Sequence, residues 1–131
     1  MANILRQETE EFTDGLESIL IRRKGGRILG GCVLDLSDWP ENKVKGGHII
    51  IKKETDGIMA YKPNAVADSE YSAIPDGWEY AGVLVRSASK TDPRAAVQYD
   101  GDINDKAMPY SIDNIKSALK AALPSLYFMH D

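Results

Sequence analysis

The stretch Trp78-Glu79-Tyr80-Ala81-Gly82-Val83-Leu84-Val85-Arg86 is the most strand-like part of the chain. Its aromatic and β-branched residues are the types that strands favour. Gly82 interrupts the apolar run, and a glycine inside a strand indicates a β-bulge or the close approach of another backbone. We therefore predict a strand over residues 78–86 with an irregularity at Gly82.

Upstream of this strand, two apolar runs indicate a β-hairpin. Gly46-Gly47 precedes the run His48-Ile49-Ile50-Ile51-Lys52, and Thr55-Asp56-Gly57 supplies the turn. Ile58-Met59-Ala60-Tyr61-Lys62 then leads back to Pro63. An Asp-Gly pair between two such runs is a strong hairpin signal, so the two runs are predicted to pair.

The other segments alternate between short apolar runs and turn residues. Lys24-Gly25-Gly26 predicts a tight reversal, because glycine adopts the positive φ that such a reversal requires. Residues 64–76 are predicted to form a surface loop that Tyr71 and Ile74 anchor to the body. Further strands are predicted at residues 18–22, 27–29, 32–36, 95–99 and 126–128, with loops at 37–42 and 87–93.

The C-terminal part has a helical period instead. Ser111 is a suitable N-cap, Pro124 ends the pattern, and the apolar positions between them follow helical spacing. These positions are Ile112, Ile115, Ala118, Leu119, Ala122 and Leu123. Six or seven short strands with one C-terminal helix predict a mainly β fold, a small single-domain barrel or sandwich whose helix covers one opening or face.

Length and composition limit the classes of protein to consider. The chain has 131 residues, 43% of them hydrophobic, which is enough for one domain with a buried core. Its net charge of −4 argues against binding to nucleic acid, and no apolar run approaches the ~20 residues of a membrane span. Residues 1–15 are acidic and predict a flexible N-terminal arm, and residues 16–131 form the predicted β-rich domain.

Residue types that carry out catalysis or bind metals are present, but their spacing indicates no site. His48 and His130 lack the spacing of metal ligands, and Cys32, the only cysteine, is expected to be a small buried hydrophobe. Asp35 and Asp38 have no partner base or acid that singles them out. We predict no catalytic residue, no metal ligand and no cofactor.

Two charged clusters also favour ordinary structural roles. Residues 100–105 begin like a calcium loop, but Asp105 stands where such a loop needs glycine, so an acidic turn is predicted. The basic cluster comprises Arg22, Arg23, Lys24 and Arg27. Because no aromatic residue accompanies it, a solvated turn or a contact patch for an acidic partner is the better interpretation.

A pattern of glycines and strands extends over residues 28–128. It comprises Gly30-Gly31-Cys32-Val33-Leu34, Gly47-His48-Ile49-Ile50, Tyr61-Lys62-Pro63, Gly77-Trp78-Glu79-Tyr80-Ala81-Gly82-Val83-Leu84, Val97-Gln98-Tyr99-Asp100-Gly101, and the run Ala118-Leu119-Lys120-Ala121-Ala122-Leu123-Pro124 before Leu126-Tyr127-Phe128. This pattern resembles the lambda-type head-decoration proteins of tailed bacteriophages and the similar base domains of head fibres. The resemblance implies a β-tulip-like sandwich or barrel that binds and stabilises the assembled head and is not an enzyme.

The same resemblance implies particular partners and a location. It implies homotrimers on the major capsid protein, at the local three-fold axes of the expanded shell, on virions assembled in the bacterial cytoplasm. It also implies an N-terminal arm that becomes ordered on the shell. In this chain Ile4, Leu5 and Phe12 would be the apolar residues of the arm that bind the capsid.

Two alternatives remain open at this level. A head-fibre or adhesin base module would display exposed aromatic residues in the loop at 64–76, where Tyr71 is the one aromatic residue. A small β-barrel that binds a ligand or catalyses a reaction would have Asp35, Asp38 or His48 in a pocket. Convergent polar groups in a pocket would favour the second alternative, and a filled interior would count against it.

Overall fold

The computed structural model describes residues 20–28 and 31–129, and the chain there is mostly β with one short helix and a curled half-barrel sheet. This confirms the predicted mainly β class. The proposed arm at residues 1–15, with Ile4, Leu5 and Phe12, lies outside the described residues, as does His130. No helix among the described residues has the length and apolarity to cross a membrane.

The elements are mostly short. The strands of four or more residues are β1 (Ile21–Lys24), β4 (Ile49–Thr55), β5 (Ile58–Pro63), β8 (Glu79–Leu84), β12 (Gly101–Asn104) and β13 (Leu126–Met129). The two-residue strands are β2 (Cys32–Val33), β3 (Lys43–Val44), β6 (Val66–Ala67), β7 (Glu70–Tyr71), β9 (Ala88–Ser89), β10 (Arg94–Ala95) and β11 (Val97–Gln98). A 3-10 turn, η1, covers Asp105–Ala107, and the helix α2 covers Lys116–Ala122.

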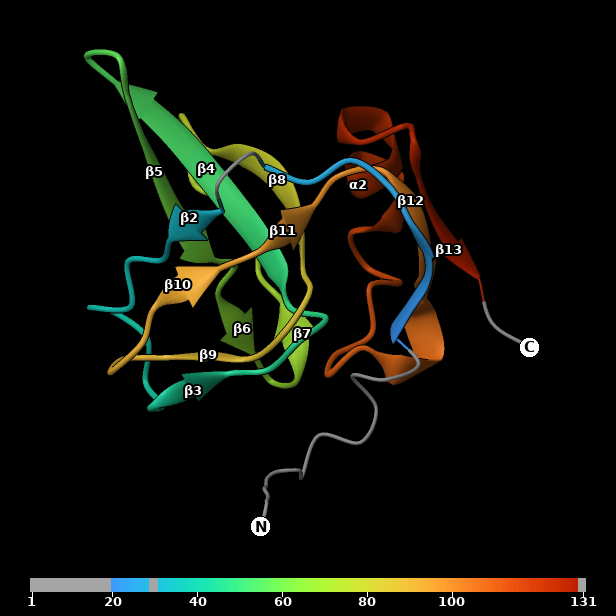
Figure 1. Cartoon of the computed structure of the whole chain (residues 1–131), viewed down its shortest axis with the longest axis horizontal. Helices are drawn as coiled ribbons and strands as arrows, with labels where there is room; N and C mark the ends of the chain where they lie inside the picture. The colour runs from blue at the N-terminus through green and yellow to red at the C-terminus, as the bar shows by residue number, and fades with distance from the viewer. Residues whose placement is uncertain (1–19, 29–30, 130–131) are drawn as a thin grey trace, which may run out of the picture.

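A four-stranded antiparallel sheet in the order β11-β8-β4-β5 organises the domain (Figure 1). The predicted hairpin is confirmed, since β4 and β5 pair from Thr55 opposite Ile58 to Ile50 opposite Pro63. Asp56 and Gly57 occupy the turn with φ of 53° and 80°. Positive φ at both central residues is the turn geometry that suits the right-handed twist of paired strands.

The predicted irregularity at Gly82 is also confirmed. Ile50 lies opposite Gly82 but Ile51 lies opposite Tyr80, so β8 contains a bulge where it pairs with β4. Gly82 has φ of 152°, and a Cβ at this position would stand 2.4 Å from the carbonyl oxygen of Gln98 in β11. The glycine therefore serves both predicted purposes, the bulge and the close approach of a neighbouring backbone.

The predicted reversal at Lys24-Gly25-Gly26 is wrong. The chain continues from β1 along its neighbour, because Gly26 accepts a hydrogen bond from the amide of Tyr99 and Ile28 donates one to Val97. A Cβ on Gly25 would lie 2.2 Å from the carbonyl oxygen of Asp100. The glycine is required here by this close contact between two extended segments.

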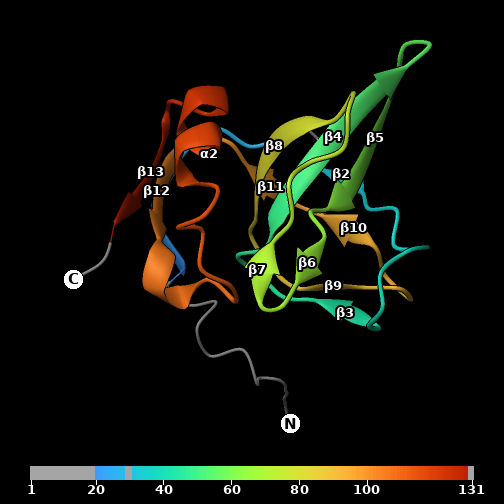
Figure 2. The ribbon, with the colours of Figure 1, turned by 180° about the vertical axis from the view of Figure 1, so that it is seen from behind.

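The acidic turn predicted at residues 100–105 is a strand instead. β12 is the middle strand of a three-stranded sheet in the order β1-β12-β13, antiparallel to β1 and parallel to β13. Its Ile103 is fully buried, which holds an otherwise polar segment in the sheet. The strand predicted near residues 126–128 is confirmed as β13, and Figure 2 shows it beside β12 and α2.

The helix is shorter than predicted. α2 begins at Lys116, and Ser111 lies upstream, where its hydroxyl accepts a hydrogen bond from the amide of Asp113 in a local turn. Leu119 is fully buried, as the helical spacing predicts, but Ala118 and Ala122 are exposed. Leu119 within the helix, with Ile115 just before it and Leu123 just after it, therefore attaches this segment to the larger core.

Several predicted loops and strands are subdivided in the structure. The loop at 64–76 contains the small hairpin β6–β7, and its anchors Tyr71 and Ile74 do pack against the core. The single strand predicted over residues 95–99 is split into β10, which pairs with β2, and β11, which pairs with β8. The described residues thus hold more and shorter strands than predicted.

Two hydrophobic cores fill the domain. The larger lies between α2, the β1-β12-β13 sheet and one face of β4 and β8, and includes Leu20, Ile51, Val83, Ile103 and Leu119. The smaller lies on the other face and includes Leu34, Val44, Ile50, Leu84 and Val97. Alternate residues of β4 and β8 point into different cores, as a two-residue strand period requires.

Candidate functional site

A pocket of about 440 Å³ opens between residues 35–41, the end of β5 and the β6–β7 hairpin. Trp39, Pro40, Pro63 and Tyr110 supply apolar and aromatic surface. Its charged lining residues are Asp35, Asp38, Glu41, Lys62 and Asp68. The lining of the pocket thus combines four carboxylates, one ammonium group and aromatic rings.

Backbone contacts fix the segment that carries three of these carboxylates. Asp35 donates its amide to the carbonyl of Tyr61 at 2.8 Å, which holds the segment against β5. The carboxylate of Asp35 then accepts hydrogen bonds from the hydroxyl and amide of Ser37, at 2.7 and 3.1 Å. Trp39 donates from its indole nitrogen to the carbonyl of Lys43 at 3.0 Å. This segment is therefore anchored at both ends of its turn.

His48 lies behind the aromatic wall of the pocket. Its ring is 1% exposed and makes edge-to-face contacts with Trp39, Tyr71 and Tyr110, at centroid distances of 5.0, 5.1 and 5.8 Å. Its Nε2 lies 2.8 Å from the carbonyl oxygen of Asn64. The buried ring of His48 thus packs against two rings of the pocket, those of Trp39 and Tyr110, and fixes their positions.

Hydrogen bonding and burial shift the pKa of two of these groups, Asp35 and His48. Hydrogen bonds from the Ser37 side chain and backbone, together with the charge of Lys62, lower the pKa of Asp35, so this carboxyl stays ionised. Burial lowers the pKa of His48 to about 4, so the imidazole stays neutral and shielded. The arrangement offers carboxylates and aromatic rings as contacts for a ligand.

Other residues singled out from the sequence lie elsewhere. Cys32 is half-buried against the smaller core, and burial raises the pKa of its thiol to about 11, which makes it a poor nucleophile. Among the described residues, no three His, Cys, Asp or Glu side chains gather as a metal site would require. Asp102 in β12 instead lies 3.3 Å from Arg23 in an ion pair.

The basic cluster is likewise engaged within the fold. Besides the pair of Arg23 with Asp102, Arg27 donates from Nε to the side-chain oxygen of Gln98 at 3.0 Å. Gln98 is fully buried and donates its own amide to the carbonyl of Arg23 at 3.2 Å. These two arginines therefore attach β1 and its continuation to the neighbouring strands.

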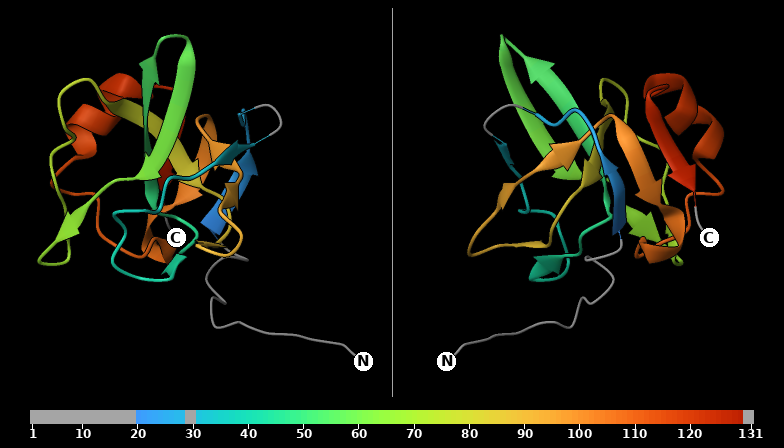
Figure 3. Two further views of the ribbon diagram at one scale, coloured as in Figure 1. Left: turned by 90° about the vertical axis from the view of Figure 1, so that its left-hand side faces the viewer. Right: turned by 45° about the vertical axis from the view of Figure 1, so that its right-hand side comes forward.

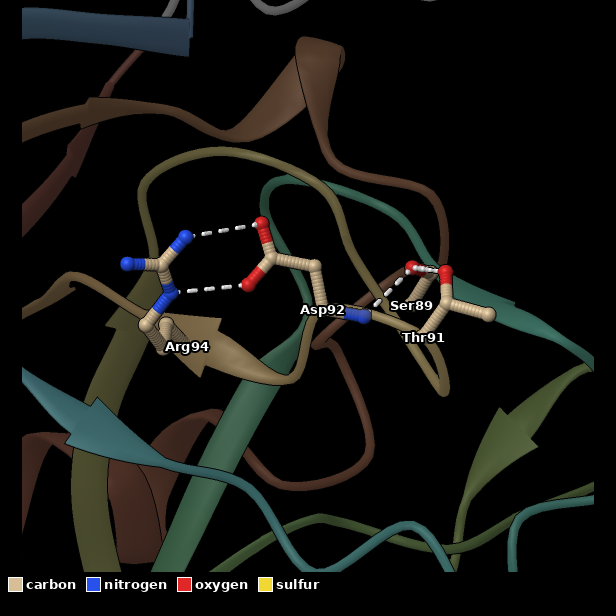
Figure 4. A network of polar contacts seen from close by, with 4 residues as sticks. All are labelled: Ser89, Thr91, Asp92 and Arg94. Carbon is tan, nitrogen blue, oxygen red and sulfur yellow. Dashed lines mark hydrogen bonds and ion pairs between the residues drawn. The ribbon is translucent and has the colours of Figure 1, made fainter.

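A further polar network lies at the surface, in the loop between β9 and β10. Figure 4 shows Arg94 bound to both carboxylate oxygens of Asp92, and Ser89 between Thr91 and the amide of Asp92. The Arg94 and Asp92 side chains are 82% and 60% exposed. This network shapes the exposed loop between β9 and β10.

The sequence pointed to Asp35, Asp38 and His48 as alternatives for a pocket, and the structure brings all three together, with His48 behind the lining. Sequence reasoning missed the contributions of Trp39 and Tyr110. These two residues come from loops that are distant in the chain, and no spacing rule links them. No family model matches this chain, and no curated protein or solved structure is similar enough to match it.

Proposed function

We propose that this chain is a capsid decoration protein of a tailed bacteriophage, which binds the assembled head and stabilises it without catalysing a reaction. The specific assignment depends on the resemblance of residues 28–128 to lambda-type head-decoration proteins. A filled interior also supports a structural role, because the two hydrophobic cores leave the described half-barrel packed with side chains.

The observation that carries the proposal is the shape of the β4–β5 hairpin. It extends well beyond the body of the domain (Figures 1 and 3). Next to its turn, Ile58 is 72% exposed and Met59 is 38% exposed. Apolar side chains at the end of a projecting element gain from burial only when another protein covers them. The hairpin therefore supports a role in assembly.

The proposed mechanism follows from simple mechanics. Packaged DNA pushes outward on a shell, and a protein that clamps neighbouring shell subunits needs matching shape and buried surface. Homotrimers on the major capsid protein would add many weak contacts at each local three-fold axis, and such multivalent contacts sum to tight binding. The arm, through Ile4, Leu5 and Phe12, would add contacts with the shell. The protein would thus be located on the outer surface of the virion.

The two alternatives have less support. The adhesin alternative needs exposed aromatic residues at 64–76, whereas Tyr71 is 3% exposed. The alternative of a ligand-binding or catalytic barrel gains the pocket beside Asp35 and Asp38, but this pocket lies at the surface and outside the filled cores. A role in assembly therefore accounts for more of the molecule.

Co-sedimentation with expanded heads of the phage that encodes the protein tests this function. We expect saturable binding of the full chain at a multiple of three copies per shell. Deletion of residues 1–15 is expected to weaken this binding, since it removes the proposed arm. Failure of the full chain to sediment with heads at saturating concentration would overturn the proposal.

A further inference from the structure

We propose that the open edge of β5, at the end of the projecting hairpin, pairs with the same edge of a second copy of this chain. The contact is antiparallel and two-fold symmetric, so each copy adds the two strands of its hairpin to the hairpin of the other. The pairing itself is independent of the proposed function, and its role on a head rests on that function.

The end of the hairpin is a ribbon of two strands. β8 pairs with β4 no further than Lys52, whereas β4 and β5 pair as far as Thr55 and Ile58. Among the described residues, 53–55 and 58–60 therefore have a neighbouring strand on one side only, and Figure 3 shows the hairpin projecting beyond the body. A ribbon of two strands is marginally stable in water, so a further strand along its edge would stabilise it.

The direction of the peptide groups in β5 identifies the positions that can pair. Residues of a strand direct their N–H and carbonyl groups alternately to its two sides. Tyr61 directs them outward, because its carbonyl accepts a hydrogen bond from the amide of Asp35 at 2.8 Å. Met59, two residues earlier, has the same direction, and no described residue bonds its amide or carbonyl along this outer edge. These two groups are therefore available to a further strand.

The side chains of the open edge also favour a strand beside it. The open residues of β5 are Ile58, Met59 and Ala60, and Ile58 is 72% exposed. Sheets usually protect an open edge from pairing with lysine or proline. β5 carries these residue types at Lys62 and Pro63, at the end that lies against the body. Its open part thus has an apolar edge without the protection that would keep other strands away.

A second copy of the chain fits this edge. Because the edge is already covered at Tyr61, antiparallel pairing is centred nearer the turn, on Ile58, which then lies against Ile58 of the second copy. In this register Ala60 lies opposite Asp56 of the second copy. Lys53 is the partner of Ala60 in β4. Each Asp56 therefore comes beside Lys53 of the other copy, across the small side chain of Ala60.

The charges at this contact are complementary and unused. Among the described residues, neither Asp56 nor Lys53 takes part in an ion pair. Two-fold symmetry forms the contact between them twice, once at each end of the paired edges. Complementary charges of this kind fix the register and select the partner more than they add affinity. The hairpin is therefore complementary to itself in backbone, apolar surface and charge.

Sedimentation velocity of the full chain, at concentrations up to about 1 mM, tests the pairing and detects an interface well below standard size. We expect a monomer–dimer equilibrium. Met59→Pro removes the outward N–H of the edge, a position where a strand tolerates proline, and should give a folded monomer. Val33→Ser changes a residue that is 63% exposed outside the hairpin and should leave the dimer intact. A chain that stays monomeric, or a dimer that Met59→Pro leaves intact, would overturn the proposal.

A charge exchange tests the two-fold register. Asp56→Lys and Lys53→Glu each bring like charges together, and each should weaken the dimer about threefold to tenfold, the range for exposed charge pairs. A mixture of the two variants restores opposite charges at both contacts, so mixed dimers should form as readily as dimers of the unaltered chain. Asp56 has a φ of 53°, and the cost of lysine there is common to monomer and dimer. A mixture that associates no better than the separate variants would contradict this register.

Cross-linking tests the centre of the contact. In a Cys32→Ser background, Ile58→Cys places two thiols across the two-fold axis, at a spacing that a disulfide can span. Thr55→Cys is the matched control, since Thr55 lies opposite Ile58 on β4 and equally near the turn. Oxidised glutathione should convert the Ile58→Cys protein to a covalent dimer and leave the Thr55→Cys protein largely monomeric. Equal cross-linking of both would contradict pairing through the β5 edge.

Head binding separates this inference from the proposed function. On a head, the two-fold contact would join hairpins of neighbouring trimers, so Met59→Pro should weaken co-sedimentation and Val33→Ser should not. Equal head binding by Met59→Pro and the unaltered chain would overturn this role on the head. If the unaltered chain does not bind heads, the proposed function fails, and sedimentation of the free protein still decides whether the hairpins pair.

Discussion

The imidazole of His48 and the backbone carbonyl of Asn64 are joined by a hydrogen bond of 2.8 Å inside the protein. Because a carbonyl oxygen can only accept, Nε2 of His48 carries the proton, and a neutral ring leaves Nδ1 without one. This tautomer holds the imidazole edge against Trp39 and Tyr110. Burial of the ring, rather than this hydrogen bond, is what keeps His48 neutral, because the bond itself raises its pKa.

Acid is expected to destabilise the fold through this histidine. Its pKa is about 4 in the folded protein and 6.5 as the ordinary value, so the unfolded chain alone takes up the proton between these values. The contribution of neutral His48 is complete above pH 6.5 and falls as the pH drops toward 4, by about 3 kcal/mol in all. Urea unfolding at pH 7 and pH 4.5 measures this loss.

The variant His48→Phe is the control for that measurement. It retains a ring but cannot be protonated, so its free energy of unfolding should depend less on pH between 6.5 and 4. The carboxyls with a lowered pKa, Asp35 and Asp92, respond to acid in both proteins alike. The same pH dependence in the variant would show that His48 is not the group responsible.

Gly82→Ala is expected to destabilise the four-stranded sheet severely. The new Cβ would stand 2.4 Å from the carbonyl oxygen of Gln98, so β8 and β11 would have to separate. We expect a loss of about 3 kcal/mol or more in the free energy of unfolding.

Gly57→Ala is the matched control, since Gly57 also has a positive φ but meets nothing within 4 Å. It should cost about 1 kcal/mol, the intrinsic preference of glycine for this conformation. Equal losses would contradict the close approach at Gly82.

These two glycines also show how far local sequence signals reach. Asp56-Gly57 predicted its turn because the turn residues themselves determine the geometry. Gly82 predicted a bulge from its place inside an apolar run. The prediction for Gly25 was wrong, because glycine is needed there for a different reason. A side chain at this position would collide with the backbone of Asp100, which lies far away in the sequence. The segment at 101–104 was misread for a similar reason, as its strand depends on pairing with β1 and β13.

Gln98→Leu is expected to destabilise the junction between the two sheets. The amide of Gln98 accepts from Arg27 and donates to the carbonyl of Arg23, and leucine leaves both groups unpaired. We expect a loss of about 1–2 kcal/mol, because the substitution removes two partly buried hydrogen bonds. Arg94→Ala breaks an exposed ion pair and should change stability little. Chemical denaturation of both variants measures the difference, and an unchanged Gln98→Leu protein would contradict the account.

Cys32 is expected to react slowly with alkylating reagents. A pKa of about 11, against 9.0 for an ordinary cysteine, lowers the thiolate fraction at pH 8 roughly a hundredfold, and the thiolate is the reactive form. Since Cys32 is the only cysteine, iodoacetamide labelling followed by mass spectrometry reports on it alone. Labelling of the folded protein as fast as the urea-unfolded protein would contradict this prediction.

The end of the projecting hairpin should matter for assembly and hardly for folding. The double variant Ile58→Ser with Met59→Ser alters exposed side chains and should change the free energy of unfolding by less than about 0.5 kcal/mol. We expect it to weaken head binding at least about tenfold, as loss of central contact residues does. Val33→Ser, at a position 63% exposed and outside the hairpin, is the control that should bind normally. Unimpaired binding by the hairpin variant would remove the hairpin from the interface.

The pocket was the least predictable part of the molecule. Its acids Asp35 and Asp38 are visible in the sequence as a pair, but Trp39 and Tyr110 meet through His48 only in the folded chain. Such a cluster leaves no repeat or spacing in the sequence. The cluster exists only in the folded chain, where residues from separate loops come into contact.

Electron cryomicroscopy of expanded heads incubated with the purified protein at saturating concentration tests the decoration function most directly. A decoration protein should give added density on the outer surface at the local three-fold axes, with three copies at each axis. Heads that show no added density under these conditions, while the protein remains folded, would contradict the proposed decoration function.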